Sequence, residues 1–128
     1  MKESFEVSEV FESTPNIIYK AWLDSEEHSN MVNGVAICSS KLGGEFNIWE
    51  DYITGKNLKL VPNIEIVQSW RTSEFSDTDE DSIITIKFEK VEKGTKLILN
   101  HSNIPEGQTQ YEEGWKEHYF APMKDYFS

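Results

Sequence analysis

The sequence predicts an α+β fold in which a curved antiparallel β-sheet wraps around one long C-terminal α-helix. Three observations predict this class: apolar residues alternate along most of the chain, two short helical segments follow the first strand, and the apolar period becomes helical near the C-terminus. We expect residues 1–128 to form a single domain, because 128 residues is close to the commonest domain length and no repeat or low-complexity linker divides the chain.

Residues 4–13 begin the chain as a half-buried strand, since their apolar side chains share one parity. Thr14 and Pro15 follow as a helix N-cap and a first helical residue, where the missing N–H of proline costs nothing. Asp24 caps a second short helix, with Glu27 three residues later as in a capping box. A strand leading into a pair of short helices is therefore the expected start of the fold.

The middle of the chain predicts an antiparallel meander, because short alternating segments are separated by turn residues. Gly55 suits either a β-bulge or a close backbone approach. Ile64, Ile66 and Trp70 share one parity and are expected to face inward together. The six expected strands are residues 35–40, 45–49, 52–61, 64–71, 84–88 and 95–99.

The last segment, residues 110–127, has a helical period and an unusually aromatic surface. Only the inner face of the sheet is large enough to cover it. Pro122 removes one backbone hydrogen bond, so we expect a kink between His118 and Pro122. The stripe consists of Tyr111, Trp115, Tyr119, Pro122 and Tyr126, with Phe120, Met123 and Phe127 on its flanks.

Charge and composition narrow the classes of partner. The formal net charge is −11, which repels phosphate backbones and anionic lipid head groups, so we expect neither nucleic acid nor membrane binding. Cys38 is the only cysteine, which excludes an internal disulfide and a Cys-based zinc site. The chain start has no apolar run typical of a signal peptide, and we expect a soluble cytoplasmic protein, a monomer or a weak dimer.

No pattern of residues indicates a catalytic or metal site. His28, His101 and His118 have no i,i+2 or i,i+4 spacing, so we expect ordinary surface or boundary histidines and no metal or cofactor. His101, at the end of an inward-facing strand, is the first to inspect. The sequence contains no nucleophile elbow, phosphate-binding glycine loop or zinc-protease motif, so we assign no catalytic residue and favour a binding protein over an enzyme.

An acidic run at residues 74–81 resembles part of a calcium loop in the spacing of Asp77, Asp79 and Asp81. Ser82 stands where the loop needs glycine, and Phe88 stands where it needs a bidentate Glu, so the match fails. We expect a solvated hairpin tip, with docking of a basic partner as the alternative.

Several short motifs occur in an order that resembles a known family. They are Val-Ala-Ile at 35–37, Gly-Gly-Glu-Phe at 43–46, Ile-Thr-Gly at 53–55, Leu-Val-Pro at 60–62, Ile-Val-Gln-Ser-Trp-Arg at 66–71, Thr-Lys-Leu at 95–97, His-Ser-Asn-Ile-Pro at 101–105, Gly-Trp at 114–115 and Tyr-Phe at 119–120. Together they resemble the C-terminal domain of the activator of heat-shock protein 90 ATPase, within the SRPBCC (START-like) superfamily, over nearly the whole chain.

The resemblance implies a helix-grip fold with a cavity between the concave sheet and the C-terminal helix, a place where superfamily members commonly hold apolar ligands. It therefore implies an apolar small molecule as the ligand of a binding module. A cyclase-like enzyme is a third alternative, for which His101, His118, Gln68 and Tyr119 are the nearest polar candidates. The candidate cavity residues are Phe46, Ile48, Ile66, Trp70, Ile86, Phe88, Leu97, Leu99, His101, Trp115, Tyr119 and Met123.

The resemblance also implies a second function, as a co-factor of a chaperone. The eukaryotic activators carry a separate N-terminal domain that makes the principal chaperone contact and bears an Asn- and Trp-rich stimulating motif. This sequence contains no such motif, so the resemblance favours a chaperone contact without stimulation of the ATPase.

Overall fold

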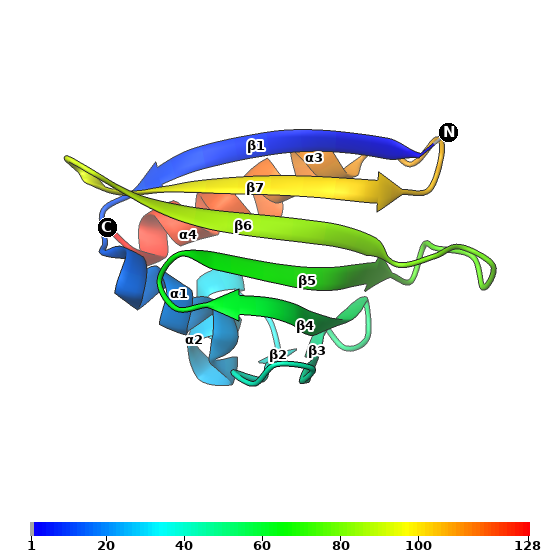
Figure 1. Ribbon diagram of the computed structural model, residues 1–128, viewed down its shortest axis with the longest axis horizontal. Coiled ribbons are helices and arrows are strands. Elements are labelled where there is room, and N and C mark those ends of the chain that lie inside the picture. The colour runs from blue at the N-terminus through cyan, green and yellow to red at the C-terminus, as the bar shows by residue number, and fades with distance from the viewer. Residues whose placement is uncertain (1) are drawn as a thin grey trace.

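The computed structural model describes residues 2–128; Met1, the first residue of the expected domain 1–128, lies outside that range. Seven strands form one antiparallel sheet in the order β1-β7-β6-β5-β4-β3-β2 (Figure 1). The strands are β1 (Glu3–Phe11), β2 (Ala36–Ile37), β3 (Glu45–Ile48), β4 (Ile53–Val61), β5 (Glu65–Thr72), β6 (Ser82–Val91) and β7 (Gly94–Ile104). The six strands expected after the helix pair are all present.

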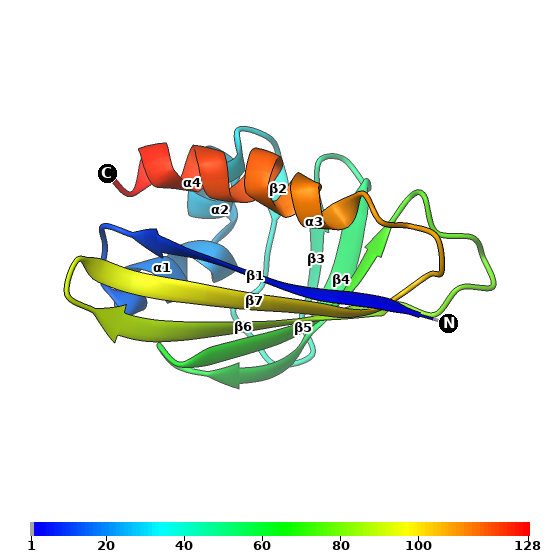
Figure 2. The same ribbon diagram turned by 90° about the horizontal axis from the view of Figure 1, so that it is seen from above.

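The helices lie on one face of this sheet (Figure 2). Between β1 and β2 come α1 (Pro15–Leu23) and α2 (Ser25–Val32). After β7 the chain forms α3 (Tyr111–Gly114), the π-helical segment η1 (Trp115–Phe120) and α4 (Ala121–Tyr126), which run continuously across the sheet. The predicted α+β class and helix-grip arrangement are confirmed.

Both predicted helix caps are confirmed. The Thr14 hydroxyl accepts a hydrogen bond from the Ile17 N–H at 3.4 Å, with proline in the first turn of α1. The Asp24 carboxylate accepts from the Glu27 N–H at 2.9 Å and so begins α2. Asn33, with φ at 57°, ends α2 in the left-handed conformation that asparagine tolerates.

Three details of the sheet differ from the expectation. The strand expected at residues 35–40 pairs only over Ala36–Ile37. Ile64 does not face inward but is 60% exposed, because β5 begins one residue later, after the turn at Asn63. The register shift in β4 lies beyond Gly55, between Asn57 and Lys59.

Gly55 instead serves the other expected purpose, a close backbone approach. A Cβ atom at this position would lie 2.0 Å from the Ser69 carbonyl oxygen on β5. It would also lie 2.6 Å from Cζ of Phe46 on β3. Only glycine lets these strands approach at this distance.

One buried cluster joins the inner face of the sheet to the helices. It contains the eight apolar sheet residues that were expected to face the helix, together with Trp115, Tyr119 and Met123 of the C-terminal helix. These eight are Phe46, Ile48, Ile66, Trp70, Ile86, Phe88, Leu97 and Leu99. Within residues 2–128, no helix combines the length and the apolar character that a bilayer span requires.

The C-terminal helix differs from the expected single α-helix with a kink at proline. The turn before Pro122 is π-helical, over Trp115–Phe120, and Pro122 lies in the first turn of α4. The buried stripe also shifts: Phe120, Met123 and Phe127 are buried, whereas Pro122 and Tyr126 are only half-buried.

The expectation of surface or boundary histidines is wrong for two of the three. His28 is 1% exposed and His101 is 0% exposed, whereas His118 is exposed as expected. Both buried rings have hydrogen-bond partners on distant elements, and those partners make burial of a polar ring tolerable.

Candidate ligand-binding pocket

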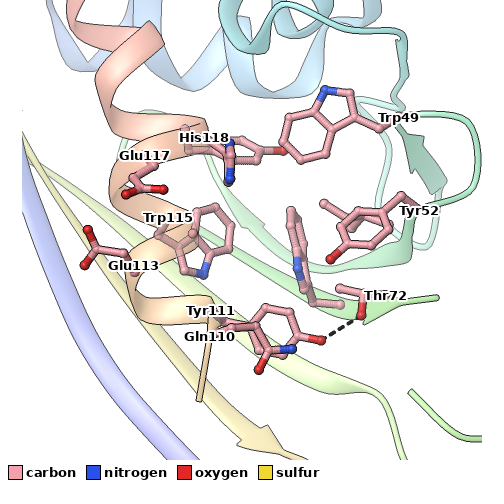
Figure 3. A pocket seen from close by; sticks show the side chains of 13 residues that line it. Trp49, Tyr52, Thr72, Gln110, Tyr111, Glu113, Trp115, Glu117 and His118 are labelled. Carbon is pink, nitrogen blue, oxygen red and sulfur yellow. Dashed lines mark hydrogen bonds between the residues drawn. The ribbon is translucent and has the colours of Figure 1, made fainter. Parts of the chain in front are cut away.

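A pocket of about 230 Å³ opens between the C-terminal helix and one side of the sheet (Figure 3). Its walls come from the β3–β4 turn, from β4 and β5, and from α3 and η1. Six of the thirteen lining residues are Trp or Tyr. They are Trp49, Tyr52, Trp70, Tyr111, Trp115 and Tyr119, with Ile53, Thr72, Gln110, Glu113, Gly114, Glu117 and His118 completing the wall.

Trp70, Trp115 and Tyr119 form the deeply buried part of this wall. The ring centroids of Trp70 and Trp115 lie 4.9 Å apart, and those of Trp115 and Tyr119 lie 4.7 Å apart. Aromatic pairs at such distances contribute about 0.5–1.5 kcal/mol beyond the area they bury. The inner wall is therefore a fixed surface.

The π-helical segment aligns these aromatic rings. Buried residues occur every four positions along the helix, at 111, 115, 119, 123 and 127. In an α-helix of 3.6 residues per turn, each such step would rotate the stripe by about 40°. The looser π turn at Trp115–Phe120 counteracts this drift and keeps the stripe on the sheet.

The turn between β3 and β4 holds Trp49 at the pocket mouth in an unusual backbone conformation. Three consecutive non-glycine residues have positive φ: Trp49 at 55°, Glu50 at 52° and Asp51 at 71°. Each such residue costs of order 1 kcal/mol, and such strain concentrates at functional sites. The side chain of Asn47 supports the turn by accepting a hydrogen bond from the Asp51 N–H at 2.7 Å.

A hydrogen-bond chain through His101 fixes Trp115 from behind. The Trp115 indole N–H donates to Nδ1 of His101 at 3.0 Å, so the imidazole proton sits on Nε2. That nitrogen lies 2.7 Å from the Ser82 hydroxyl, which donates to the Trp70 carbonyl oxygen at 2.6 Å. Burial lowers the pKa of His101 to about 3, so the ring is neutral and structural at pH 7.

A second series of hydrogen bonds, through His28, fixes Tyr119. Nδ1 of His28 donates to the Trp22 carbonyl oxygen at 2.7 Å, which leaves Nε2 to accept from the Tyr119 hydroxyl at 2.8 Å. Burial lowers the pKa of His28 to about 4, against the opposing effect of the backbone hydrogen bond. Burial also raises the pKa of Tyr119, so this hydroxyl remains protonated.

This series of hydrogen bonds continues from Trp22 through the core to the β2–β3 loop. The Trp22 indole donates to the Gln68 side-chain oxygen at 3.1 Å, and the Gln68 amide donates to Asn57 at 2.8 Å. The Asn57 amide donates to the backbone carbonyl oxygens of Ser39 and Lys41. The helix, the sheet and the loop are thus linked by one satisfied polar network.

Polar groups on the opposite side of the pocket are also hydrogen-bonded within the protein. The Thr72 hydroxyl lies 2.7 Å from the Tyr111 hydroxyl, which donates to the Gln108 side chain at 2.7 Å. The Tyr52 hydroxyl donates to Glu74. Burial and the neighbouring Glu74 carboxylate raise the pKa of Tyr52 above its ordinary value.

A larger hollow, of about 430 Å³, lies on the outer face of the sheet. Charged side chains of both signs border it, among them Glu45, Lys56, Arg71 and Asp81. It lies on the face of the sheet opposite the helices, and Phe46 is the one aromatic residue among the ten that line it. We therefore take the inner pocket as the candidate site.

The structure separates the twelve candidate cavity residues into three groups. Trp70, Trp115 and Tyr119 line the pocket. His101 lies behind it, in contact with Trp115. The remaining eight are buried in the core cluster: Phe46, Ile48, Ile66, Ile86, Phe88, Leu97, Leu99 and Met123.

Sequence reasoning missed the outer half of the pocket, chiefly Trp49, Tyr52 and Tyr111. Trp49 and Tyr52 flank a turn, where strand parity says nothing about orientation. The sequence did contain one indication of this wall: two large aromatic side chains beside a hairpin turn are expected to be buried against another element. Tyr111 was assigned to the helical stripe, and its position at the pocket edge follows only from the helix docking.

None of the four polar candidates for catalysis forms an acid–base pair. His101 and Gln68 are held inside the core, and the Tyr119 hydroxyl is committed to His28. His118 is exposed at the pocket edge. Within residues 2–128, no group of three His, Cys, Asp or Glu side chains is placed to hold a metal ion.

The acidic run lies in the exposed β5–β6 loop, as expected for a solvated hairpin tip. Arg71 organises this loop, since its guanidinium donates to the backbone carbonyl oxygens of Asp79 and Ser76 and to the Asp81 carboxylate. Asp77 and Glu80 remain exposed at the tip.

Comparison with known proteins places this geometry in a family. The family model described as activator of Hsp90 ATPase homolog 1-like protein matches residues 12–128. The human activator of 90 kDa heat shock protein ATPase homolog 1 is 26% identical over 124 residues, which are 94% of this chain and 36% of that protein. The Dictyostelium discoideum homologue is 27% identical over 128 residues, 98% of this chain and 33% of that protein. The chain thus spans about a third of the length of these relatives.

Solved structures show the same architecture. An HSP90 activator from Plasmodium falciparum superposes with a TM-score of 0.87 at 26% identity, covering 96% of this chain and 94% of that one. A protein from Micromonospora echinospora superposes with a TM-score of 0.81 at 17% identity, covering 99% of this chain and 77% of that one. The second likeness shows the shared fold alone.

Proposed function

This chain belongs to the activator of Hsp90 ATPase homolog 1-like family, and from this premise we propose that it binds a small molecule in the pocket under its C-terminal helix. The observation that carries the proposal is the pocket itself: an aromatic hollow of about 230 Å³ beside an otherwise filled core. Its volume lies below the roughly 300–1,000 Å³ typical of drug-sized ligands, so the ligand is smaller than these.

The stiffness of the walls supports binding to a preformed site. Trp115 and Tyr119 are each anchored by a buried histidine, and within residues 2–128 no buried side-chain nitrogen or oxygen lacks a hydrogen-bond partner. A wall that is already ordered loses little conformational entropy when a ligand binds. The strained turn at Trp49 supports the same view, because strain of this kind accumulates at ligand sites.

Native mass spectrometry and thermal-shift screening test this proposal. The protein is screened against small aromatic metabolites and short-chain lipids. A ligand at one hundred times its Kd adds about 2.7 kcal/mol to stability. That gain raises Tm by several degrees in a domain of this size. We expect at least one compound class to give a saturable increase.

A pocket-filling variant ties the signal to the site. Gly114→Leu adds a side chain where the pocket is open, since a Cβ at this position meets no atom within 4 Å. It should abolish the ligand-induced increase in Tm. Glu112→Leu is the matched control, because Glu112 is exposed on the same helix and does not line the pocket. An equal ligand-induced increase in Tm in both variants would contradict the assignment of the site.

A chaperone contact is the second candidate, favoured by the names of two similar proteins, the human activator of 90 kDa heat shock protein ATPase homolog 1 and the HSP90 activator from Plasmodium falciparum. The acidic β5–β6 loop is the surface we propose for it, because Asp77 and Glu80 project from a loop that Arg71 holds in place. Opposite charge on a partner would accelerate association and make it salt-dependent.

Calorimetric titration of this protein into an Hsp90-type chaperone, at two salt concentrations, tests this candidate. Replacing Asp77 and Glu80 by lysine should weaken binding to the chaperone. Added salt should weaken the binding of the wild-type protein more than the binding of this variant. Binding that ignores both changes would remove the loop from the interface. The ATPase rate measured alongside decides whether contact is accompanied by stimulation.

A further inference from the structure

We propose that the pocket under the C-terminal helix recognises a small organic cation of the alkylammonium class, with a quaternary or tertiary nitrogen. This inference rests on the proposed function and adds the chemical class of the ligand. Three features of the pocket carry it: the aromatic walls, the charge at the mouth and the polar groups that remain available.

Aromatic rings surround the pocket from both the sheet and the helix (Figure 3). Six Trp and Tyr side chains contribute to its wall. The face of such a ring carries partial negative charge and attracts a cation within about 6 Å of its centroid, and tryptophan does so best. Enclosure by several rings is the arrangement that proteins use to bind methylated ammonium groups.

Most of the polar hydrogens on these rings are already used inside the protein. Four of the six rings donate to protein acceptors: Tyr52 to Glu74, Tyr111 to Gln108, Trp115 to His101 and Tyr119 to His28. The Trp70 indole N–H makes no hydrogen bond within residues 2–128 and suits a hydroxyl or ether oxygen on the ligand, whereas that of Trp49 lies beside Gly34, outside the pocket wall. The rings therefore offer a ligand mainly their π faces.

The charge at the mouth is negative. Glu113 and Glu117 line the pocket from the helix, and Glu74 lies behind Tyr52. No Lys or Arg side chain of the described residues lines it, and the chain as a whole has a net charge of −11. The carboxylates of Glu113 and Glu117 point away from the aromatic rings (Figure 3), so they act on a ligand through the long-range field, which repels a carboxylate or phosphate and attracts a cation from solution.

The wall also distinguishes among cations. A primary ammonium group carries three N–H donors, and burying these without acceptors is costly. The wall is predominantly apolar, so it has few acceptors for such a group. A quaternary ammonium has no N–H group to satisfy and presents methyl groups to the rings. Alkylation of the nitrogen should therefore strengthen binding.

A pair of isosteric probes provides the test. Choline and 3,3-dimethylbutan-1-ol have nearly the same shape, but only choline is charged. Calorimetric titration of each into the full chain at low salt should show choline binding about ten-fold more tightly or better. Ethanolamine, the primary amine counterpart, should bind more weakly than choline.

Two variants locate the effect. The double variant Glu113→Gln with Glu117→Gln should weaken choline binding several-fold and leave the neutral isostere unchanged. Glu112→Gln is the matched control: it makes the same kind of charge change on the same helix but does not line the pocket, and it should retain full affinity. Trp49→Leu keeps an apolar wall but removes a ring, so it should reduce the preference for choline over the isostere.

The outcomes separate this inference from the function on which it rests. Equal affinity for choline and the neutral isostere would overturn the cation assignment while leaving a small-molecule site in place. Absence of binding by both, together with no hit in the wider screen, would overturn the small-molecule function as well. If Glu112→Gln, which removes one charge, loses half as much choline-binding free energy as the double variant, which removes two, then only the overall charge matters, and this contradicts a site at the pocket.

Discussion

Tyr119 shows how one residue serves both the pocket and the core. Its ring lines the pocket, while its hydroxyl donates to Nε2 of His28, a residue 91 positions earlier in the sequence. An unsatisfied buried acceptor costs about 1–3 kcal/mol. The stability of the fold is therefore linked to the position of a pocket side chain.

Tyr119→Phe should accordingly lower the free energy of unfolding by about 1–3 kcal/mol, because it leaves Nε2 of His28 buried without a donor. Urea unfolding measures this change. Tyr19→Phe removes the same atom from another buried tyrosine whose hydroxyl makes no hydrogen bond within residues 2–128, and it should change stability by less than about 0.5 kcal/mol. Similar losses in both variants would contradict the proposed role of the Tyr119–His28 bond.

The same residues mark the limit of prediction from sequence at this scale. Strand parity correctly identified inward residues such as Trp70 and Leu99, because a period of two decides which face a side chain occupies. It could not identify His28 as buried, because the partners that allow this burial come from α1 and from the C-terminal helix. Burial of a polar side chain depends on tertiary contacts that no local pattern contains.

At the scale of the element, the C-terminal helix combines a π turn with a proline. The sequence predicted its position and its aromatic face, but assigned the irregularity to a proline kink. The spacing of four between Tyr111, Trp115 and Tyr119 was the overlooked indication of looser winding. Pro122 follows this segment as the second residue of α4, in a helix that continues without a break, so its missing N–H removes one hydrogen bond from the interior of that helix.

Pro122→Ala therefore tests which feature shapes the helix. A proline inside a regular α-helix costs about 3 kcal/mol, so its replacement would normally stabilise by that amount. Because the turn before Pro122 is already π-helical and its looser winding accommodates the proline ring, we expect a gain below about 1 kcal/mol in urea unfolding. A gain near 3 kcal/mol would mean that proline alone imposes the π turn.

Gly114→Ala tests a conflict between stability and binding in the same helix. Gly114 has helical φ and ψ of −58° and −42°, so alanine fits and should stabilise the helix by about 0.5–1 kcal/mol. The added methyl group projects where the pocket is open and should weaken ligand binding. Thermal unfolding and ligand titration of one variant measure both effects, and tighter binding with higher Tm would contradict the proposed pocket wall.

At the scale of the whole molecule, two buried neutral histidines make stability depend on pH. The unfolded chain gains protons near the ordinary histidine pKa of 6.5, whereas the folded pKa values are about 4 for His28 and about 3 for His101. Their contribution is complete above pH 6.5 and is lost as the pH falls toward these values, because the unfolded state then binds more protons.

We therefore expect the free energy of unfolding to fall between pH 7 and pH 4.5 by roughly 2 kcal/mol for each histidine. Urea unfolding across this range measures the slope. His101→Gln should reduce the slope, since it removes one of the two groups. An unchanged slope in His101→Gln would contradict a neutral buried His101.

The overall architecture was the most predictable level. Alternating strands, two capped helices and an aromatic C-terminal helix specify the class, because each local pattern agrees with the same global fold. The pocket was less predictable. Its outer wall is formed by Trp49 and Tyr52, whose positions depend on a strained turn with no periodic pattern to reveal it.

Binding of a small organic cation under the C-terminal helix can be followed at the indole N–H signals of the four tryptophans in a ¹⁵N–¹H spectrum. Trp49, Trp70 and Trp115 line the pocket, whereas Trp22 lies in the core with its N–H bonded to Gln68. Titration with benzyltrimethylammonium should give saturable shifts of the three pocket signals, with the Trp22 signal moving least. Four unmoved signals, or four that move equally without saturation, would contradict the account.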